Sequence, residues 1–400
     1  MPPYIAEKIT NEAPTAKIAS EVKEKIEKPL ATARKELPLP TLEEIRDAIP
    51  PECFQRSNLK SCFYLALDYA FIATCYLLLP YFEGYGGFAG LLGWYWLMGM
   101  FLSGLFMIGH DCGHDTFSDN IILNDIAGLL AHAPLLTPEE EYHSSSWLEH
   151  QLAKVPFMGF FKWHFGVMLS GVPDGCYYWP FSKLFVNNTE RLQCFVSTAL
   201  CFACSAIAFK VCDYSVYSFV KYYFIPILFY GFWMVMVTTL QHAEDETEVY
   251  EQGTWTYVKG QAQTVDRQYG LVPDFVLHHI TDGHVAHHFF QRIPHYHLLE
   301  ATKAVKKVLE KYPGTYRCRP CRDHLLEFLR LNNSFEYLIG KGTGVLKYNV
   351  ARFLSKRPED SWNKLNSLWG KRSSNWQTAN GLWGKRSSPS GHHMRMYPRI

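Results

Sequence analysis

The chain has 400 residues and a net charge of +1, with 19% charged and 16% aromatic residues. This balance leaves no basic surface for nucleic acid, and long uncharged runs favour one membrane protein over two soluble domains. Of the 11 cysteines, Cys318 and Cys321 form a Cys-x-x-Cys with no matching pair nearby, and several others, including Cys201 and Cys204, lie in apolar runs. We therefore expect free thiols facing a reducing compartment, and no disulfide framework.

Three regions follow from composition. Residues 1–38 are rich in Lys, Glu, Ala and Pro, which predicts a polar cytosolic tail without a signal peptide. Residues 39–355 form the main domain, and 356–400 form an unrelated tail. At the start of the main domain, residues 39–51 predict a short amphipathic helix, begun by Thr41 with Glu44 as its capping-box partner.

Four apolar stretches are long enough to cross a bilayer. They span about 62–82, 85–109, 193–212 and 216–240, and Pro226 predicts a kink in the last one. The simplest topology places both ends of the chain on the cytosolic side. We predict an all-α membrane protein with about four transmembrane helices in two hairpins and a cytosolic helical cap. The alternative interpretation is a set of buried helices in a soluble protein.

Histidines gather where these stretches end and in the polar segment beyond them. Two of them end the second stretch one helical turn apart, another ends the fourth, and a His-x-x-His-His motif follows. Imidazole nitrogens suit iron, copper, zinc and nickel, so the pattern predicts one shared metal centre rather than core histidines. The candidate ligands are His110, His114, His242, His284, His287 and His288.

Other polar residues near these histidines are candidates to orient the imidazoles by accepting their ring N–H groups, although helix capping is an equal alternative. They are Asp111, Asp119 and Asp282, with His278 and His279 for this role or for a substrate site. His295 and His297 follow Pro294 and are expected to pack or cap.

Several segments carry a family resemblance. GHDCGHDTFSDN, LQHAEDETEVYE, QAQTVDRQYG and HHITDGHVAHHFFQRIPHYHLLEATKAVKKVLE resemble the membrane-bound fatty acid desaturases of the ω-6/ω-3 (Δ12/Δ15-type) branch. AIPPECFQRS and VPDGCYYWPFSKLF are similar to nematode members. The resemblance spans roughly residues 39–348.

This resemblance implies a di-iron enzyme of the endoplasmic reticulum membrane with its catalytic cap in the cytosol. Such an enzyme removes two hydrogens from an acyl lipid or acyl-CoA, using O2 and electrons from cytochrome b5 and its reductase. No His-Pro-Gly-Gly motif occurs, so cytochrome b5 would be a separate protein. Hydroxylases and acetylenases share the scaffold, and the sequence does not separate them.

The chain departs from the family at the second of three histidine boxes. The first box matches His110 and His114, and the third matches the His-x-x-His-His motif, but no second box follows Leu136. His143 and His150 occur there with a spacing that matches no box. This loss predicts a chain that holds one metal weakly and is a poor catalyst. A non-enzymatic relative that modulates an intact desaturase is the alternative class.

The tail differs from the family in a second way. Two units each contain two tryptophans with six residues between them and end in Trp-Gly before Lys-Arg. They resemble a W-x6-W-amide neuropeptide precursor, which conflicts with the missing signal sequence. The alternatives are exons of two genes joined together, or a chance repeat of WGKRSS.

Overall fold

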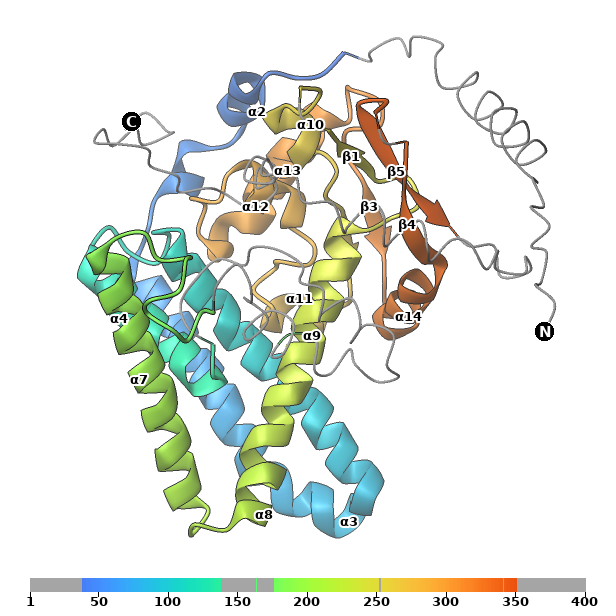
Figure 1. Ribbon diagram of the computed structural model, residues 1–400. Coiled ribbons are helices and arrows are strands. Elements are labelled where there is room, and N and C mark those ends of the chain that lie inside the picture. The colour runs from blue at the N-terminus through green and yellow to red at the C-terminus, as the bar shows by residue number, and fades with distance from the viewer. Residues whose placement is uncertain (1–37, 138–162, 164–175, 252, 341, 351–400) are drawn as a thin grey trace, which may run out of the picture. The chain divides into compact units, whose positions relative to one another are not determined.

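Figure 1 shows the computed structural model, which describes residues 38–137, 163, 176–251, 253–340 and 342–350. All of these except Pro38 belong to one compact unit that begins at Leu39. Long apolar helices form one end of this unit, and shorter helices and strands form a cap at the other. The predictions on the tails and on His143 and His150 lie outside the described residues.

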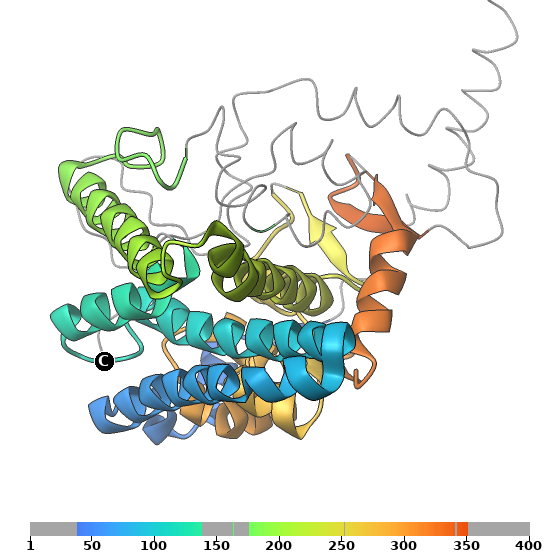
Figure 2. The same ribbon diagram turned by 90° about the horizontal axis from the view of Figure 1, so that it is seen from below.

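The first two apolar stretches are the two arms of α3 (Asn58–Gly113). A straight helix of 56 residues would be about 84 Å long, far beyond the roughly 30 Å of a bilayer core. The helix reverses direction at Gly87, whose φ of +54° is a conformation that favours glycine. Figures 1 and 2 both show the two arms side by side. Trp94 Nε1 donates to the Cys75 carbonyl across the arms at 2.7 Å. A Cβ on Gly90 would lie 2.1 Å from the Phe82 carbonyl oxygen.

The second pair of apolar stretches begins with α7 (Asn188–Val211), which Asn187 and Glu190 start with a reciprocal capping box. After a short turn, α8 (Val216–Phe219), the π-helical η4 (Val220–Phe224) and α9 (Ile225–His242) follow one another. Pro226 stands at the start of α9, directly after the π-helical turn. Among the described residues, three helices are long and apolar enough to cross a membrane: Asn58–Gly113, Asn188–Val211 and Val216–His242.

Helix α9 packs along α3 and brings aromatic side chains into the core. Tyr230 and Trp233 are fully buried, and Trp233 Nε1 donates to the Trp96 carbonyl at 3.0 Å. Helix α4 (Ile121–His132), started by Asn120, lies against the last turns of α3, where His132 meets Phe106 and Gly109, and it continues into η2 (Ala133–Leu135). The C-terminal ends of α3 and α9, which carry predicted ligands, therefore lie close to the cap.

The cap is built mainly of short helices. They are α2 (Leu42–Ala48), η1 (Pro51–Phe54), α10 (Tyr257–Gln261), α11 (Leu271–Val276), α12 (His284–Phe289), η5 (His295–His297), α13 (Leu298–Leu309) and α14 (His324–Ser334). Thr41 Oγ1 accepts from the Glu44 N–H at 3.0 Å, as predicted, whereas the Glu44 carboxylate accepts from the Tyr312 hydroxyl at 2.7 Å. The apolar side of α13 packs on Ile45 of α2.

In the described part of the cap there are also five short strands, so the all-α prediction is wrong in this part of the molecule. β5 (Val345–Val350) pairs antiparallel with β1 (Glu248–Tyr250) and with β4 (Phe335–Ile339). β2 (Asp266–Gln268) pairs in parallel with β3 (Cys318–Pro320). Strands of three to six residues are too short for an alternating apolar pattern to indicate them.

Candidate metal centre

The six histidines chosen from the sequence lie in two groups of three. Within each group the nearest ring nitrogens all lie within 4.8 Å of one another. The first group contains His110, His114 and His287, and the second contains His242, His284 and His288. The sequence predicts one shared metal centre, whereas the structure divides the six imidazoles between two groups.

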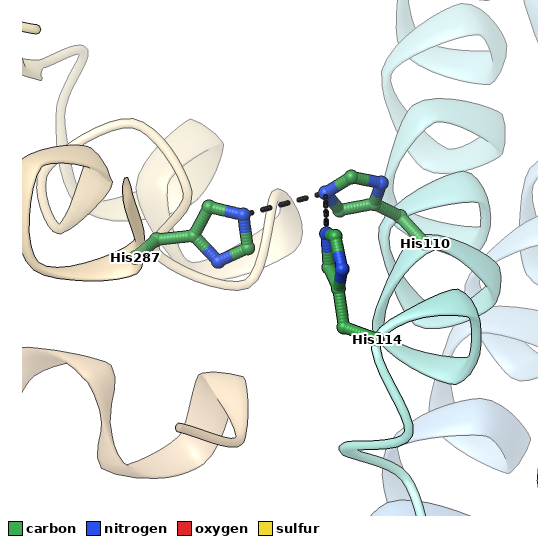
Figure 3. Close-up of side chains that lie close together, drawn as sticks. All are labelled: His110, His114 and His287. Atoms are coloured by element: carbon green, nitrogen blue, oxygen red, sulfur yellow. Dashed lines mark hydrogen bonds between the residues drawn. The ribbon is translucent and has the colours of Figure 1, made fainter. Parts of the chain in front are cut away.

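The first group joins the membrane bundle to the cap. His110 lies in the last turn of α3 and His114 is its C-cap residue, and their Nε2 atoms are 3.1 Å apart. His287 of α12 points at them from the opposite side, with its Nε2 3.3 Å from that of His110 (Figure 3). Because α3 belongs to the bundle and α12 to the cap, this group exists only when the cap is seated on the bundle.

The second group lies at the end of α9. His242 is the last residue of that helix, and its Nε2 is 3.0 Å from His284 Nε2. His284 and His288 are one turn apart on α12 and face the same way, whereas His287 projects about 100° around the helix from His288. The His-x-x-His-His spacing thus sends one imidazole to the first group and two to the second.

Hydrogen bonds fix which nitrogen faces each group. The Ile280 carbonyl can only accept, so His284 Nδ1, at 3.1 Å, is the donor. His288 Nδ1 likewise donates to Gln261 Oε1 at 3.0 Å. In the neutral ring, Nε2 of both residues then carries the lone pair and is the atom that each residue can offer to a metal in the second group.

Burial keeps the imidazoles of α12 neutral. It lowers the pKa of His284, His287 and His288 well below the usual value, and the neighbouring histidines lower it further. Unprotonated nitrogens that converge in a buried place form the donor set that divalent transition metals prefer. Both groups therefore fit a metal site.

Strand β2 holds the elements that carry these groups. The Asp266 carboxylate accepts from the Val285 N–H at the start of α12 and from the Tyr316 hydroxyl, both at 2.8 Å. The Arg267 N–H donates to the Thr281 carbonyl at 2.8 Å, and its Nε donates to the Leu240 carbonyl at 2.6 Å. The last turn of α9 and the segment before α12 are thereby tied to one strand.

Sequence reasoning assigned no role to Gln261, Asp266 or Arg267, although all three lie in the segment QAQTVDRQYG that carried the resemblance. A glutamine on a five-residue helix and an Asp-Arg pair on a three-residue strand have no distinctive spacing. Only the fold brings them against the histidines.

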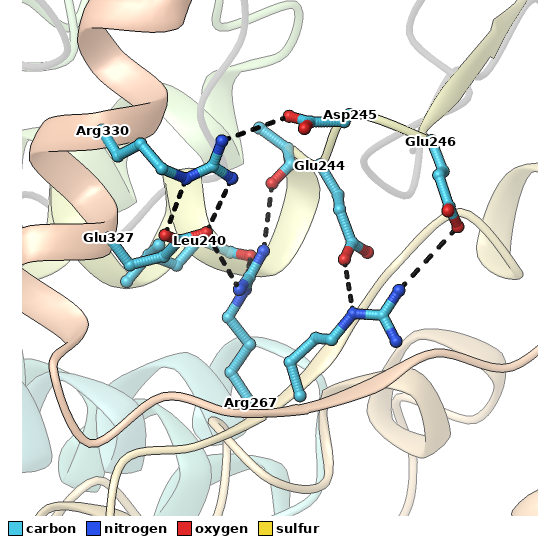
Figure 4. A network of polar contacts seen from close by, with 9 residues as sticks. Leu240, Glu244, Asp245, Glu246, Arg267, Glu327 and Arg330 are labelled. Carbon is cyan, nitrogen blue, oxygen red and sulfur yellow. Dashed lines mark hydrogen bonds and ion pairs between the residues drawn. The ribbon is translucent and has the colours of Figure 1, made fainter.

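An ion-pair network extends this support (Figure 4). Arg267 lies 3.8 Å from Glu327 of α14, which also pairs with Arg330 at 2.8 Å. Arg330 reaches Asp245 at 3.6 Å, in the segment that directly follows His242. On β3, Arg319 pairs with Glu244 of the same segment at 2.7 Å. The chain after α9 is thus fastened to both α14 and β3.

We expect the buried member of this network to matter most for stability. Arg267 is 3% exposed, and Arg267→Ala leaves the Leu240 carbonyl without its charged donor, which should cost about 2 kcal/mol. Arg319 is 44% exposed, so Arg319→Ala should cost roughly 0–1 kcal/mol. Thermal unfolding followed by tryptophan fluorescence measures both changes. Equal shifts for the two variants would show that burial of Arg267 does not set its contribution.

The residues proposed to orient the imidazoles have the following partners. Asp111 accepts from His295 Nδ1 at 2.9 Å, and His278 Nε2 donates to Asp68 at 2.8 Å. His279 Nδ1 donates to Asp282 at 3.0 Å. Asp119 pairs with Arg56. His295, expected to pack or cap, is buried and begins η5.

Long apolar helices whose ends meet two largely enclosed groups of three imidazoles, in which the residues of α12 are buried, define a membrane protein with a histidine-rich metal site. The sequence profile of the family "Fatty acid desaturase" matches residues 86–320, which is more than half of the chain. The chain belongs to the fatty acid desaturase family and is an oxidoreductase of lipid metabolism.

Curated relatives point to one branch of this family. The chain is 44% identical over 342 residues to the Delta(12) fatty acid desaturase fat-2 of Caenorhabditis elegans, covering 78% of this chain and 91% of that protein. It is 41% identical over 354 residues to the Omega-3 fatty acid desaturase fat-1 of the same organism, covering 81% and 88%. The predicted resemblance to the nematode ω-6/ω-3 branch is confirmed. These relatives do not favour a non-enzymatic protein.

The same alignments show a deficit in this chain. The alignment with fat-2 is 342 residues long but uses 78% of this chain, which is about 312 of 400 residues. The alignment with fat-1 is 354 residues long and uses 81%, which is about 324 residues. About 30 positions of each relative therefore have no counterpart in this chain. That length is enough to contain the second histidine box, which this sequence lacks after Leu136.

Proposed function

We propose that this chain is a Δ12- or ω-3-type desaturase that inserts a double bond into a membrane acyl chain with iron bound by the two histidine groups. The observation that carries the proposal is the convergence of six imidazoles, three buried and three half-buried, in two groups of three where the apolar helices meet the cap. The relatives named for Δ12 and ω-3 desaturation support the reaction type.

Each part of the site has a distinct task in this proposal. His110, His114 and His287 would hold one iron, and His242, His284 and His288 the other. When bound, the irons supply the redox chemistry with O2 that breaking an unactivated C–H bond requires. Gln261 and the Ile280 carbonyl hold His288 and His284 in the tautomer that presents Nε2. The burial of α12 keeps water away from the centre.

The topology and partners belong to the same proposal. The two arms of α3, α7 and the α8–α9 segment would make four crossings of the endoplasmic reticulum membrane, with both ends of the chain in the cytosol. His110 and His242 both end apolar helices, which supports placing both groups at one face of the bilayer. Cytochrome b5 and its reductase would deliver electrons to the cap, which belongs to a desaturase domain of residues 39–355.

The test is expression in a yeast that makes no diunsaturated fatty acids, with methyl esters profiled by gas chromatography. The chain is expressed as it stands and with a His-x-x-His-His segment inserted after Leu136, with oleate or linoleate supplied. We expect a di- or triunsaturated 18-carbon product. A hydroxylated product would show that the chain catalyses hydroxylation instead of desaturation. If neither form yields a new product, the proposal is wrong.

A further inference from the structure

A third cluster of metal-ligating side chains lies in the cap, distinct from the two all-imidazole groups. Cys53 of η1, His297 of η5 and Glu300 in the first turn of α13 bring a thiol, an imidazole and a carboxylate together. One ligand atom from each lies within 4.8 Å of the other two. The residues come from the segments AIPPECFQRS and IPHYHLLE, for which the desaturase chemistry provides no use.

The backbone around this cluster is firmly held. The Ser57 N–H donates to the Tyr296 hydroxyl at 2.7 Å, so the chain after Cys53 is bonded to the residue before His297. The Phe54 ring packs edge-on against Phe290 at 5.9 Å. Cys53 also shares one apolar cluster with Leu298 and other residues of α13. Contacts made by the chain around η1 and by the chain around η5 and α13 therefore fix the positions of the three ligand atoms.

The cluster opens to solvent on one side only. Cys53 is fully buried, His297 is half-buried and Glu300 is exposed. A cation can enter past the Glu300 carboxylate and keep a water molecule on its open side.

The donor set selects the class of cation. Sulfur and imidazole nitrogen are poor ligands for magnesium and calcium, which take oxygen ligands. Zinc binds cysteine, histidine and glutamate in tetrahedral sites, and three protein ligands with a water molecule are a common arrangement. We propose that Cys53, His297 and Glu300 bind one zinc-class divalent cation, which fastens the N-terminal segment of the cap (residues 41–54) to α13.

Cobalt(II) is the probe that separates this site from the histidine groups. It is titrated into the purified, metal-free full-length protein, and the sulfur-to-cobalt charge-transfer band in the near ultraviolet is recorded. Groups made only of imidazole nitrogens produce no such band, so it reports the thiolate ligand alone. Cobalt bound by the histidine groups adds nothing to this band, so we expect its final intensity to match one sulfur-ligated cobalt per chain and the band to be displaced by zinc.

Three variants complete the test. Cys53→Ser should remove the band, and Cys321→Ser, at another buried cap cysteine, should retain it. Glu300→Gln, at an exposed position that leaves the core intact, should weaken cobalt binding at least tenfold and reduce the zinc-induced rise in melting temperature. The absence of the band from the unaltered protein, its persistence in Cys53→Ser, or unchanged affinity in Glu300→Gln would each overturn the proposal.

Discussion

His287→Ala should reduce the unsaturated product at least a hundredfold. His287 is the cap's contribution to the first group, where its Nε2 lies 3.3 Å from His110 Nε2 on α3. Its removal leaves two imidazoles from a single helical turn, which is too few ligands to hold a redox metal in a defined geometry. Product in the yeast strain, measured by gas chromatography at equal protein level, provides the test.

His279→Ala is the matched control for this variant. It lies five residues before His284, is 24% exposed, and pairs with Asp282 outside both groups. We expect it to retain at least half of the product. If His279→Ala and His287→Ala lose activity equally, the loss reflects damage to the cap rather than removal of a ligand.

Restoring a His-x-x-His-His segment after Leu136 should raise the product at least tenfold over the chain as it stands. The six described imidazoles provide three ligands for each metal, and additional nitrogens increase both metal affinity and the stability of the oxidised centre. The alignment deficit of about 30 residues is long enough to include a segment of this kind.

The control for this insertion is a segment of the same length with alanines at the three histidine positions. It restores chain length without adding ligands, so we expect no gain from it. An equal gain from both insertions would mean that the deficit limits folding rather than metal binding, and the three-ligand interpretation of each group would be wrong.

The sequence identified much of this site because histidines at the ends of apolar stretches are a local pattern. His110, His114 and His242 each fall where a predicted span stops, and the structure places them at helix ends. The division into two groups was beyond the sequence, because it depends on how α12 is oriented between α3 and α9. The contact between His110 and His287 joins residues 177 positions apart.

The fold shows the same limit. Apolar length predicted the helices, and Gly87, near the start of the second predicted span, marks the reversal of α3. The strands of the cap were missed because each is stabilised by partners distant in the chain, as when β2 pairs with β3 some 50 residues later. Gln261 gains its role only because α10 lies against α12, where it meets His288.

The most direct test of two separate centres is the iron content of the purified protein, measured for the unaltered chain, His287→Ala and His242→Ala. We predict two irons per chain in the unaltered protein and one in each variant, because each substitution removes a ligand from a different group. Mössbauer spectra should show that the iron retained differs between the two variants. One iron per chain in the unaltered protein, lost in both variants, would contradict the account and indicate a single shared centre.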